Sequence, residues 1–168
     1  YAQTYKRGVP QDEVHVIWET DKRGTTISFT PDTTIFETDE FSYTTISTRL
    51  KHAAYLTPGV VFTVVDEVKG RAERFYFEGG IKTWLTNLVG VQQQLSPQFS
   101  IAQEGNEVMV DIVFQFVDST NDNMLSFVNN ITTKDGGTHV VGFKNALLTV
   151  INDLAKEKGL IDKKIGEY

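Results

Sequence analysis

The chain has 168 residues, enough for one domain that buries roughly 70% of its unfolded surface. Hydrophobic residues make up 40% of it and charged residues 23%, which excludes collagen-like, low-complexity and largely disordered chains. The absence of cysteine excludes disulfides, thiol nucleophiles and cysteine-ligated metals. A net charge of −6 argues against a general electrostatic affinity for nucleic acid, so any contact with DNA must be local.

The start of the chain is polar and has no initiator methionine. No apolar run approaches the ~20 residues that a membrane-crossing helix needs. We therefore expect an excised part of a longer protein that makes no contact with a membrane.

Alternating apolar and polar residues predict two strands near the start, over 14–18 and 24–29, joined by a charged turn that ends at Gly24. The second strand places Thr25, Ile27 and Phe29 on one face and ends at Pro31. From residue 44 the apolar period changes to three and four, which predicts a helix over 46–54 that ends at Pro58 and Gly59.

The rest of the chain alternates strands with helices. Apolar patterns predict strands over 60–65 and 73–77, a short helix over 81–88, a hairpin of 98–103 with 107–117 that turns at Gly105-Asn106, and a strand over 124–131. A glycine turn at 134–137 then precedes the last helix, which begins after an N-cap at Thr138 and ends at Gly159. Strands with about three helices on one face give an α+β fold.

No catalytic constellation emerges from the reactive side chains. The histidines lie at 15, 52 and 139 without metal-ligand spacing, the densest acidic groups at 66–67 and 118–122 are typical of solvated loops, and Ser126 lacks a nucleophile elbow. Gly-Gly-Thr-His at 136–139 could cradle an anion, but it lacks the Lys-Ser/Thr of a phosphate-binding loop, so a glycine turn with a threonine N-cap is the favoured interpretation.

Positive charge gathers towards the end of the chain. Residues 134–168 hold six lysines and five acidic residues, a net charge of +1, against −7 for the rest. Lys144 follows Phe143 and lies off the apolar stripe of the last helix, so we expect it to face solvent or a partner of that helix.

The order of several motifs resembles, from end to end, the B subunit of bacterial DNA gyrase and of its relative topoisomerase IV. These motifs are Gly-Thr-Thr-Ile-Ser-Phe-Thr-Pro-Asp (24–32) with Ile35-Phe36, Arg49-Leu50 to Ala54-Tyr55-Leu56, Tyr-Phe-Glu-Gly-Gly-Ile (76–81), and Ser-Phe-Val-Asn-Asn-Ile (126–131) through Gly-Gly-Thr-His (136–139) to Gly142-Phe143-Lys144. One departure is Tyr-Leu-Thr-Pro-Gly at 55–59, where Phe-Leu-Asn-x-Gly is commoner, so we expect that helix end to cap differently.

This resemblance implies part of an ATP-driven type II topoisomerase. Residues 1–35 resemble the last strands of its GHKL-type ATPase domain. Residues 36–168 resemble its transducer domain up to a Gln-x-Lys loop, a ribosomal-protein-like fold with a mostly antiparallel sheet, covering helices and a left-handed βαβ crossover. Thr25 matches a position that hydrogen-bonds near the adenine, Ile27 an apolar wall position, and Lys144 a basic position facing the cavity between two B protomers through which DNA passes.

The resemblance also implies cofactors and partners. ATP and magnesium serve the full-length protein, but none is expected on this stretch, which we expect to be inactive alone because the general base, the magnesium ligand and the Gln-x-Lys lysine lie outside it. The implied partners are the topoisomerase A subunit in an A2B2 heterotetramer, a second B protomer and DNA, in the bacterial cytoplasm at the nucleoid. Gyrase and topoisomerase IV are not separated on this stretch. A free-standing α+β nucleic-acid-binding module without catalysis remains the alternative.

Overall fold

The computed structural model describes residues 1–105 and 107–161. Contacts between Cα atoms divide the chain into two compact units, Tyr1–Ile46 and Ser47–Tyr168, each described here by itself. The division falls in the first turn of helix α1, after the domain boundary expected at residue 35, and that boundary stays a prediction. Within the described residues, no helix is long and apolar enough to cross a membrane.

The first unit begins with a short hairpin of strands β1 (Tyr5–Lys6) and β2 (Val9–Pro10). Its two loop residues, Arg7 and Gly8, have φ angles of 53° and 79°, as a type I′ turn requires. Ala2 and His15 add one isolated antiparallel bridge beside it.

The strands expected over 14–18 and 24–29 do not form, and this prediction is wrong. Among the described residues of this region, only His15 takes part in β pairing, and Ile27 and Phe29 are 82% and 73% exposed. An alternating pattern specifies a strand only when a neighbouring strand satisfies its backbone and a packed surface covers its apolar face. Residues 24–29 have neither here.

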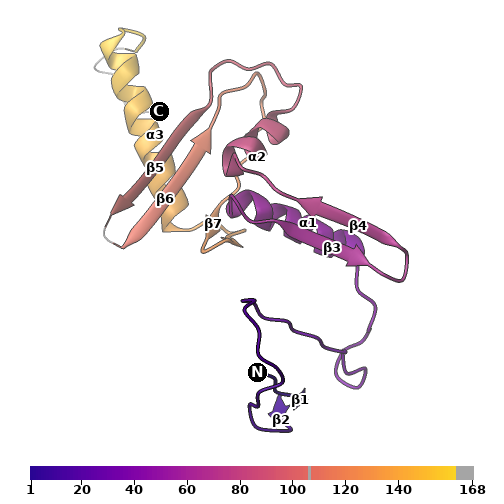
Figure 1. The fold of residues 1–168 in the computed structure, drawn as a ribbon. Coiled ribbons are helices and arrows are strands. Elements are labelled where there is room, and N and C mark those ends of the chain that lie inside the picture. The colour runs from indigo at the N-terminus through magenta and orange to yellow at the C-terminus, as the bar shows by residue number, and fades with distance from the viewer. Residues whose placement is uncertain (106, 162–168) are drawn as a thin grey trace. The chain divides into compact units, whose positions relative to one another are not determined.

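A helix whose first turn ends the first unit leads into the second unit and is followed there by a hairpin, as expected. Helix α1 (Tyr43–Leu56) begins after Ser42, whose Oγ accepts the backbone N–H of Thr45 at 3.3 Å, an N-cap bond. Strands β3 (Phe62–Asp66) and β4 (Arg71–Phe75) then pair antiparallel, and the Ser47 hydroxyl on α1 donates to the Glu73 carboxylate on β4. Figure 1 shows the helix alongside this hairpin.

The end of α1 is held by a threonine. The N–H and the hydroxyl of Thr57 both donate to the carbonyl oxygen of Ala53, at 3.0 and 2.6 Å. Gly59 follows with a φ of 87°, a conformation that suits glycine. The Thr57 hydroxyl therefore supplies a side-chain hydrogen bond at this end of the helix.

An aromatic stack forms the core of the second unit. The ring of Tyr55 on α1 lies 3.8 Å from that of Phe77 and 5.1 Å from that of Trp84, which belongs to helix α2 (Gly80–Val89). Trp84 in turn lies 5.3 Å from Phe127. The other buried hydrophobic side chains among the described residues are those of Ala54, Val64 and Val89. The stack therefore ties α1, α2 and the segment at 127 to one another.

A second hairpin carries its own aromatic cluster. Strands β5 (Phe99–Gly105) and β6 (Val108–Phe114) pair with Phe99 opposite Phe114, confirming the expected hairpin, while Asn106 of its expected turn lies outside the described residues. The ring of Phe114 also lies 5.8 Å from that of Phe143 on helix α3 (Thr138–Glu157). This contact joins the hairpin to the last helix.

Residues 124–131 form a hairpin and not the single strand expected. Strands β7 (Phe127–Val128) and β8 (Ile131–Thr132) flank Asn129 and Asn130, whose φ angles are 49° and 64°. Asparagine tolerates the left-handed conformation better than most residues, so the pair forms a two-residue turn of type I′. The turn reverses the chain where the apolar pattern alone predicted continuation.

The last helix starts and ends at glycines. Gly137, and not Thr138 as expected, takes the N-cap position, and no side chain caps the helix there. At the other end Gly159 has a φ of 66°, its N–H donates to the Lys156 carbonyl, and the N–H of Leu160 donates to the Ala155 carbonyl. These two bonds form a Schellman motif and confirm the expected end at Gly159.

The α+β class with antiparallel strands is confirmed. The strands of the described residues form four separate antiparallel pairs. No parallel pair occurs among them, so the left-handed βαβ crossover stays a prediction.

Candidate functional site

A chain of polar contacts links the β7–β8 hairpin to the first turn of α3. The Ser126 hydroxyl donates to the Thr133 carbonyl at 3.1 Å and lies 2.7 Å from the Thr133 hydroxyl. That hydroxyl lies 3.3 Å from Nε2 of His139, the second residue of α3. Ser126 and His139 are therefore occupied in holding the backbone together, which agrees with the absence of a nucleophile motif.

The two glycines before α3 are required by this arrangement. Gly136 and Gly137 have φ angles of 73° and 150°, which side-chain-bearing residues rarely adopt. A Cβ atom on Gly137 would lie 2.9 Å from Cε1 of His139, closer than two carbons approach. The Gly-Gly-Thr-His motif thus works as a turn that returns the histidine to Thr133. The glycine turn of the favoured interpretation is confirmed, whereas its threonine N-cap is wrong, because Gly137 takes that position.

Lys144 lies on the exposed side of α3. It borders an open hollow of about 480 Å³ between the β7–β8 hairpin and the helix, together with Val140 one turn earlier. Lys134, in the turn before α3, and Ser126 and Thr133 also line it. No ion pair involves Lys134 or Lys144 in the part of the chain that the structure describes. The hollow therefore presents two lysines that have no ion-pair partner among the described residues, and Asp135 is the acidic group at its border.

The other two expected site residues lie in the first unit. Thr25 and Ile27 are both exposed, within an irregular segment, and Ile27 is 82% exposed. They lie two residues apart, and because the expected strand does not form, the structure does not place them on one face of a strand. They belong to a different unit from Lys144.

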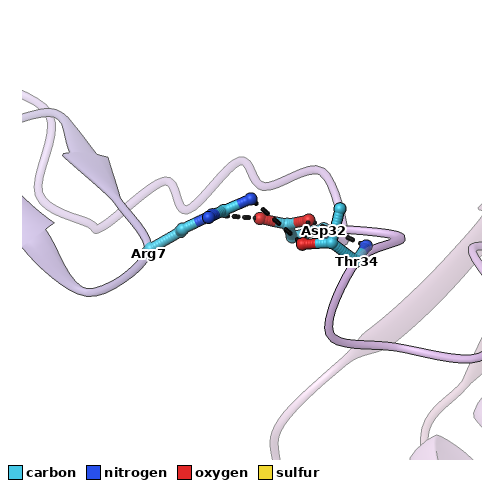
Figure 2. A network of polar contacts seen from close by, with 3 residues as sticks. All are labelled: Arg7, Asp32 and Thr34. Carbon is cyan, nitrogen blue, oxygen red and sulfur yellow. Dashed lines mark hydrogen bonds and ion pairs between the residues drawn. The ribbon is translucent and has the colours of Figure 1, made fainter.

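A polar network that sequence reasoning missed follows this segment (Figure 2). Nε of Arg7 donates to Oδ2 of Asp32 at 2.5 Å, and Nη2 of Arg7 donates to the Thr34 hydroxyl at 3.0 Å. The same hydroxyl donates to Oδ1 of Asp32 at 2.6 Å, and the Thr34 N–H donates to it at 2.9 Å. The three side chains therefore close a ring that fixes the hairpin of β1 and β2 to the chain after Pro31.

The hydrogen bonds of this network stabilise the charged form of the Asp32 carboxylate. Donation from the Thr34 hydroxyl, then from the Thr34 N–H and from Arg7, holds the pKa of Asp32 below its ordinary value of 3.8. The signal in the sequence is an aspartate followed two residues later by a threonine, which is typical of an Asx turn. Nothing in the sequence pointed to Arg7 as its partner.

Metal-binding chemistry has no support among residues 1–105 and 107–161. No group of three or more His, Asp or Glu side chains there could hold a metal ion. The residues described do not fit a magnesium site, so we assign them no step that involves the metal.

Comparison with known proteins shows what the chain is similar to. The DNA gyrase B family model matches residues 80–167, more than half of the chain. The DNA gyrase B subunit of Eisenibacter elegans is 37% identical over 170 residues, which cover 97% of this chain and 36% of that protein. The DNA topoisomerase 4 B subunit of Streptococcus pneumoniae is 41% identical over 143 residues, 85% of this chain and 22% of that protein.

A solved structure agrees with both sequence matches. The 43K ATPase domain of Thermus thermophilus gyrase B, in complex with an aminocoumarin, has a TM-score of 0.76 and 31% identity, over 98% of this chain and 46% of that one. These matches define a class, the B subunits of gyrase and topoisomerase 4. The chain belongs to the DNA gyrase B family, and its relatives in this class include both gyrase and topoisomerase 4 subunits, which confirms the resemblance seen in its motifs. It spans about a third or less of the two curated relatives, at 36% and 22% of their lengths.

Proposed function

We propose that this chain is part of an ATP-dependent type II DNA topoisomerase B subunit, which couples ATP binding and hydrolysis to DNA strand passage and so changes supercoiling or linkage. Membership of the DNA gyrase B family supports this, as does the name of the solved relative, an ATPase domain. The observation that carries the DNA part is the exposure of Lys144 at a hollow within the matched residues.

The first unit supplies the nucleotide side of this function. The Thr25 hydroxyl would hydrogen-bond near the adenine, and Ile27, two residues further on, would pack against the ring. ATP, when bound, supplies the free energy of the cycle. Because Ile27 is 82% exposed, its apolar surface is free to cover a ligand or another segment.

The second unit acts as a lever that moves as one body. The stack of Tyr55, Trp84 and Phe127 connects α1 and α2 to the β7–β8 hairpin. The contact between Thr133 and His139 then connects that hairpin to α3, which carries Lys144. A displacement of one element therefore moves the others, as rigid-body coupling requires.

The partners follow from the class of the relatives. The protein works with the topoisomerase A subunit in an A2B2 heterotetramer, with a second B protomer and with DNA, in the bacterial cytoplasm at the nucleoid. Magnesium serves the nucleotide through residues other than those described. The alternative, a free-standing nucleic-acid-binding module, requires strong DNA affinity from a chain whose net charge is −6, and it is less favoured.

The test reverses the charge of Lys144 in the complete B subunit assembled with its A subunit. Lys144→Glu should lower the stimulation of ATP turnover by duplex DNA, because the phosphate backbone loses an attractive contact and meets a repulsive one. Lys158→Glu is the matched control, since Lys158 is exposed at the other end of α3, outside the hollow. If both variants fold by circular dichroism and keep equal stimulation, Lys144 has no role in DNA passage.

A further inference from the structure

Lys134 shares the hollow with Lys144 but has no role in the function proposed above. It comes from the turn between β8 and α3, whereas Lys144 comes from the second turn of the helix. We propose that Lys134 and Lys144 together clamp a phosphodiester group of the duplex DNA backbone. This rests on the proposed function, and it adds Lys134 as a second DNA-binding residue with a sequence-independent contact.

The backbone around Lys134 is held in place before any ligand arrives. The N–H of Gly136 donates to the Thr133 carbonyl at 3.0 Å, which closes a β-turn with Lys134 and Asp135 at its two central positions. The N–H of Thr133 donates to the Ser126 carbonyl at 2.9 Å, so the turn is fixed to the hairpin. A lysine on such a turn loses little backbone entropy when it binds, which favours a specific contact over a chance one.

The charges at the hollow favour an anion. Lys134 and Lys144 form no ion pair with any residue that the structure describes, and Asp135 is the acidic residue on the lining. The three groups sum to one positive charge, which a single phosphodiester would neutralise. The contact is electrostatic, and lysine acts on phosphate as a point charge.

The hydrogen bonds already made by hydroxyls on the lining explain why the contact would not depend on the base sequence of the DNA. The Ser126 and Thr133 hydroxyls already bond to each other and the Ser126 hydroxyl also bonds to the backbone, so the charged donors that the lining offers a ligand are the two ammonium groups. Both lysines are exposed and the hollow is open, which suits a phosphate carried on a polymer better than a small anion enclosed on all sides. Contacts of this kind fix the position of DNA without specifying its sequence.

The experiment measures the salt dependence of duplex DNA binding by the complete B subunit assembled with its A subunit. Removal of one phosphate contact lowers the slope of log K against log salt by about 0.9. Because both lysines hold the same phosphodiester, the double variant Lys134→Gln/Lys144→Gln should lower the slope by about 0.9 in all, and each single variant should lower it by a part of that amount, on two duplexes of different sequence alike. Lys158→Gln should leave the slope unchanged. Lys134→Arg, which keeps the positive charge, should show the slope of the parent protein.

The outcomes separate the two proposals. If Lys144→Gln lowers the slope and Lys134→Gln does not, the clamp is refuted while the DNA-facing role of Lys144 stands. If neither does, the DNA role of the whole surface fails. Titration with inorganic phosphate forms a second arm: phosphate binding that depends on Lys134, with an unchanged DNA slope, would identify a free-anion site and overturn the clamp.

Discussion

Replacing Tyr55 by phenylalanine separates the two ways in which this residue supports the core. Its ring is 2% exposed and stacks between Phe77 and Trp84. Its hydroxyl accepts a hydrogen bond of 2.7 Å from Nδ2 of Asn87 on α2. Tyr55→Phe removes only that bond, whereas Tyr55→Ala removes the ring as well.

The burial and contacts of Tyr55 determine how much unfolding free energy each variant is expected to lose. A hydrogen bond of this kind contributes about 0.5–1.5 kcal/mol net. Because Asn87 is exposed, water can replace the lost acceptor, so we expect Tyr55→Phe to cost about 0.5–1 kcal/mol. Truncation of a buried aromatic ring to alanine costs about 3–5 kcal/mol. For a chain of this size, 1 kcal/mol corresponds to a shift of about 2–4 °C in Tm.

The assay is urea unfolding of the 168-residue chain, followed by tryptophan fluorescence. Trp84 reports on the stack directly, while Trp18 in the first unit is 68% exposed and gives a background signal. Asn87→Ala and the double variant with Tyr55→Phe complete a mutant cycle, in which we expect a coupling of about 0.5–1 kcal/mol.

Two results would refute this reasoning. Strict additivity of Tyr55→Phe and Asn87→Ala would show that the hydroxyl and the amide do not interact in solution. A loss below about 2 kcal/mol for Tyr55→Ala would show that the stack is not the core of the second unit, because buried aromatic truncations cost more than this.

Three further changes test other features. Burial first, and then the charges of Lys51 and Arg49, lower the pKa of His52 from its ordinary 6.5. Folding therefore favours the neutral imidazole, and the stability that this supplies is fully present above pH 6.5 and is lost as the pH falls towards the lowered pKa. His52→Gln should therefore flatten the decline of the urea midpoint between about pH 7 and 5, and a decline as steep as in the parent would exclude His52 as its source. Gly137→Ala should cost about 1–3 kcal/mol, because of its φ of 150° and the contact with His139, whereas Gly142→Ala, which meets no atom within 4 Å, should cost nothing. Thr25→Ala should weaken nucleotide binding by the complete ATPase domain about two- to tenfold in calorimetry, the value of one hydrogen bond; equal affinity would leave Thr25 without a role at the nucleotide.

The sequence predicted those elements whose apolar pattern has a packing partner close along the chain. The helix over 43–56 and the hairpin of β3 and β4 follow one another directly, and contacts such as Ser47 with Glu73 join them. The strand expected over 24–29 fails for the opposite reason, since its pairing depends on segments that local pattern does not specify. A pattern of period two indicates which residues can share a face, but not whether a second strand is present.

Long-range polar contacts could not be predicted from the sequence for a similar reason. Arg7 and Asp32 are 25 residues apart, and nothing in either neighbourhood identifies the other as its partner. The turn at Asn129 and Asn130 was predictable in principle, because adjacent asparagines favour positive φ, but the apolar residues on both sides suggested one strand. Lys144 was placed correctly on an exposed face because helical periodicity is strictly local.

The block from Ser126 to Lys144 holds two kinds of residue. Its asparagines make the turn, its glycines permit the return of the chain, and Ser126, Thr133 and His139 bond to one another. A side chain on Gly137 would disturb the backbone that carries the lysines, because its Cβ would meet the His139 ring. Lys134 and Lys144 form no ion pair with any described acidic residue, so the fold does not neutralise their charges through such a pair. A backbone fixed this closely around two lysines without a described ion-pair partner, with a net charge of +1 once Asp135 is counted, is the arrangement expected of a surface that binds an anionic partner. On that basis the clamp is a stronger interpretation than two unrelated surface lysines.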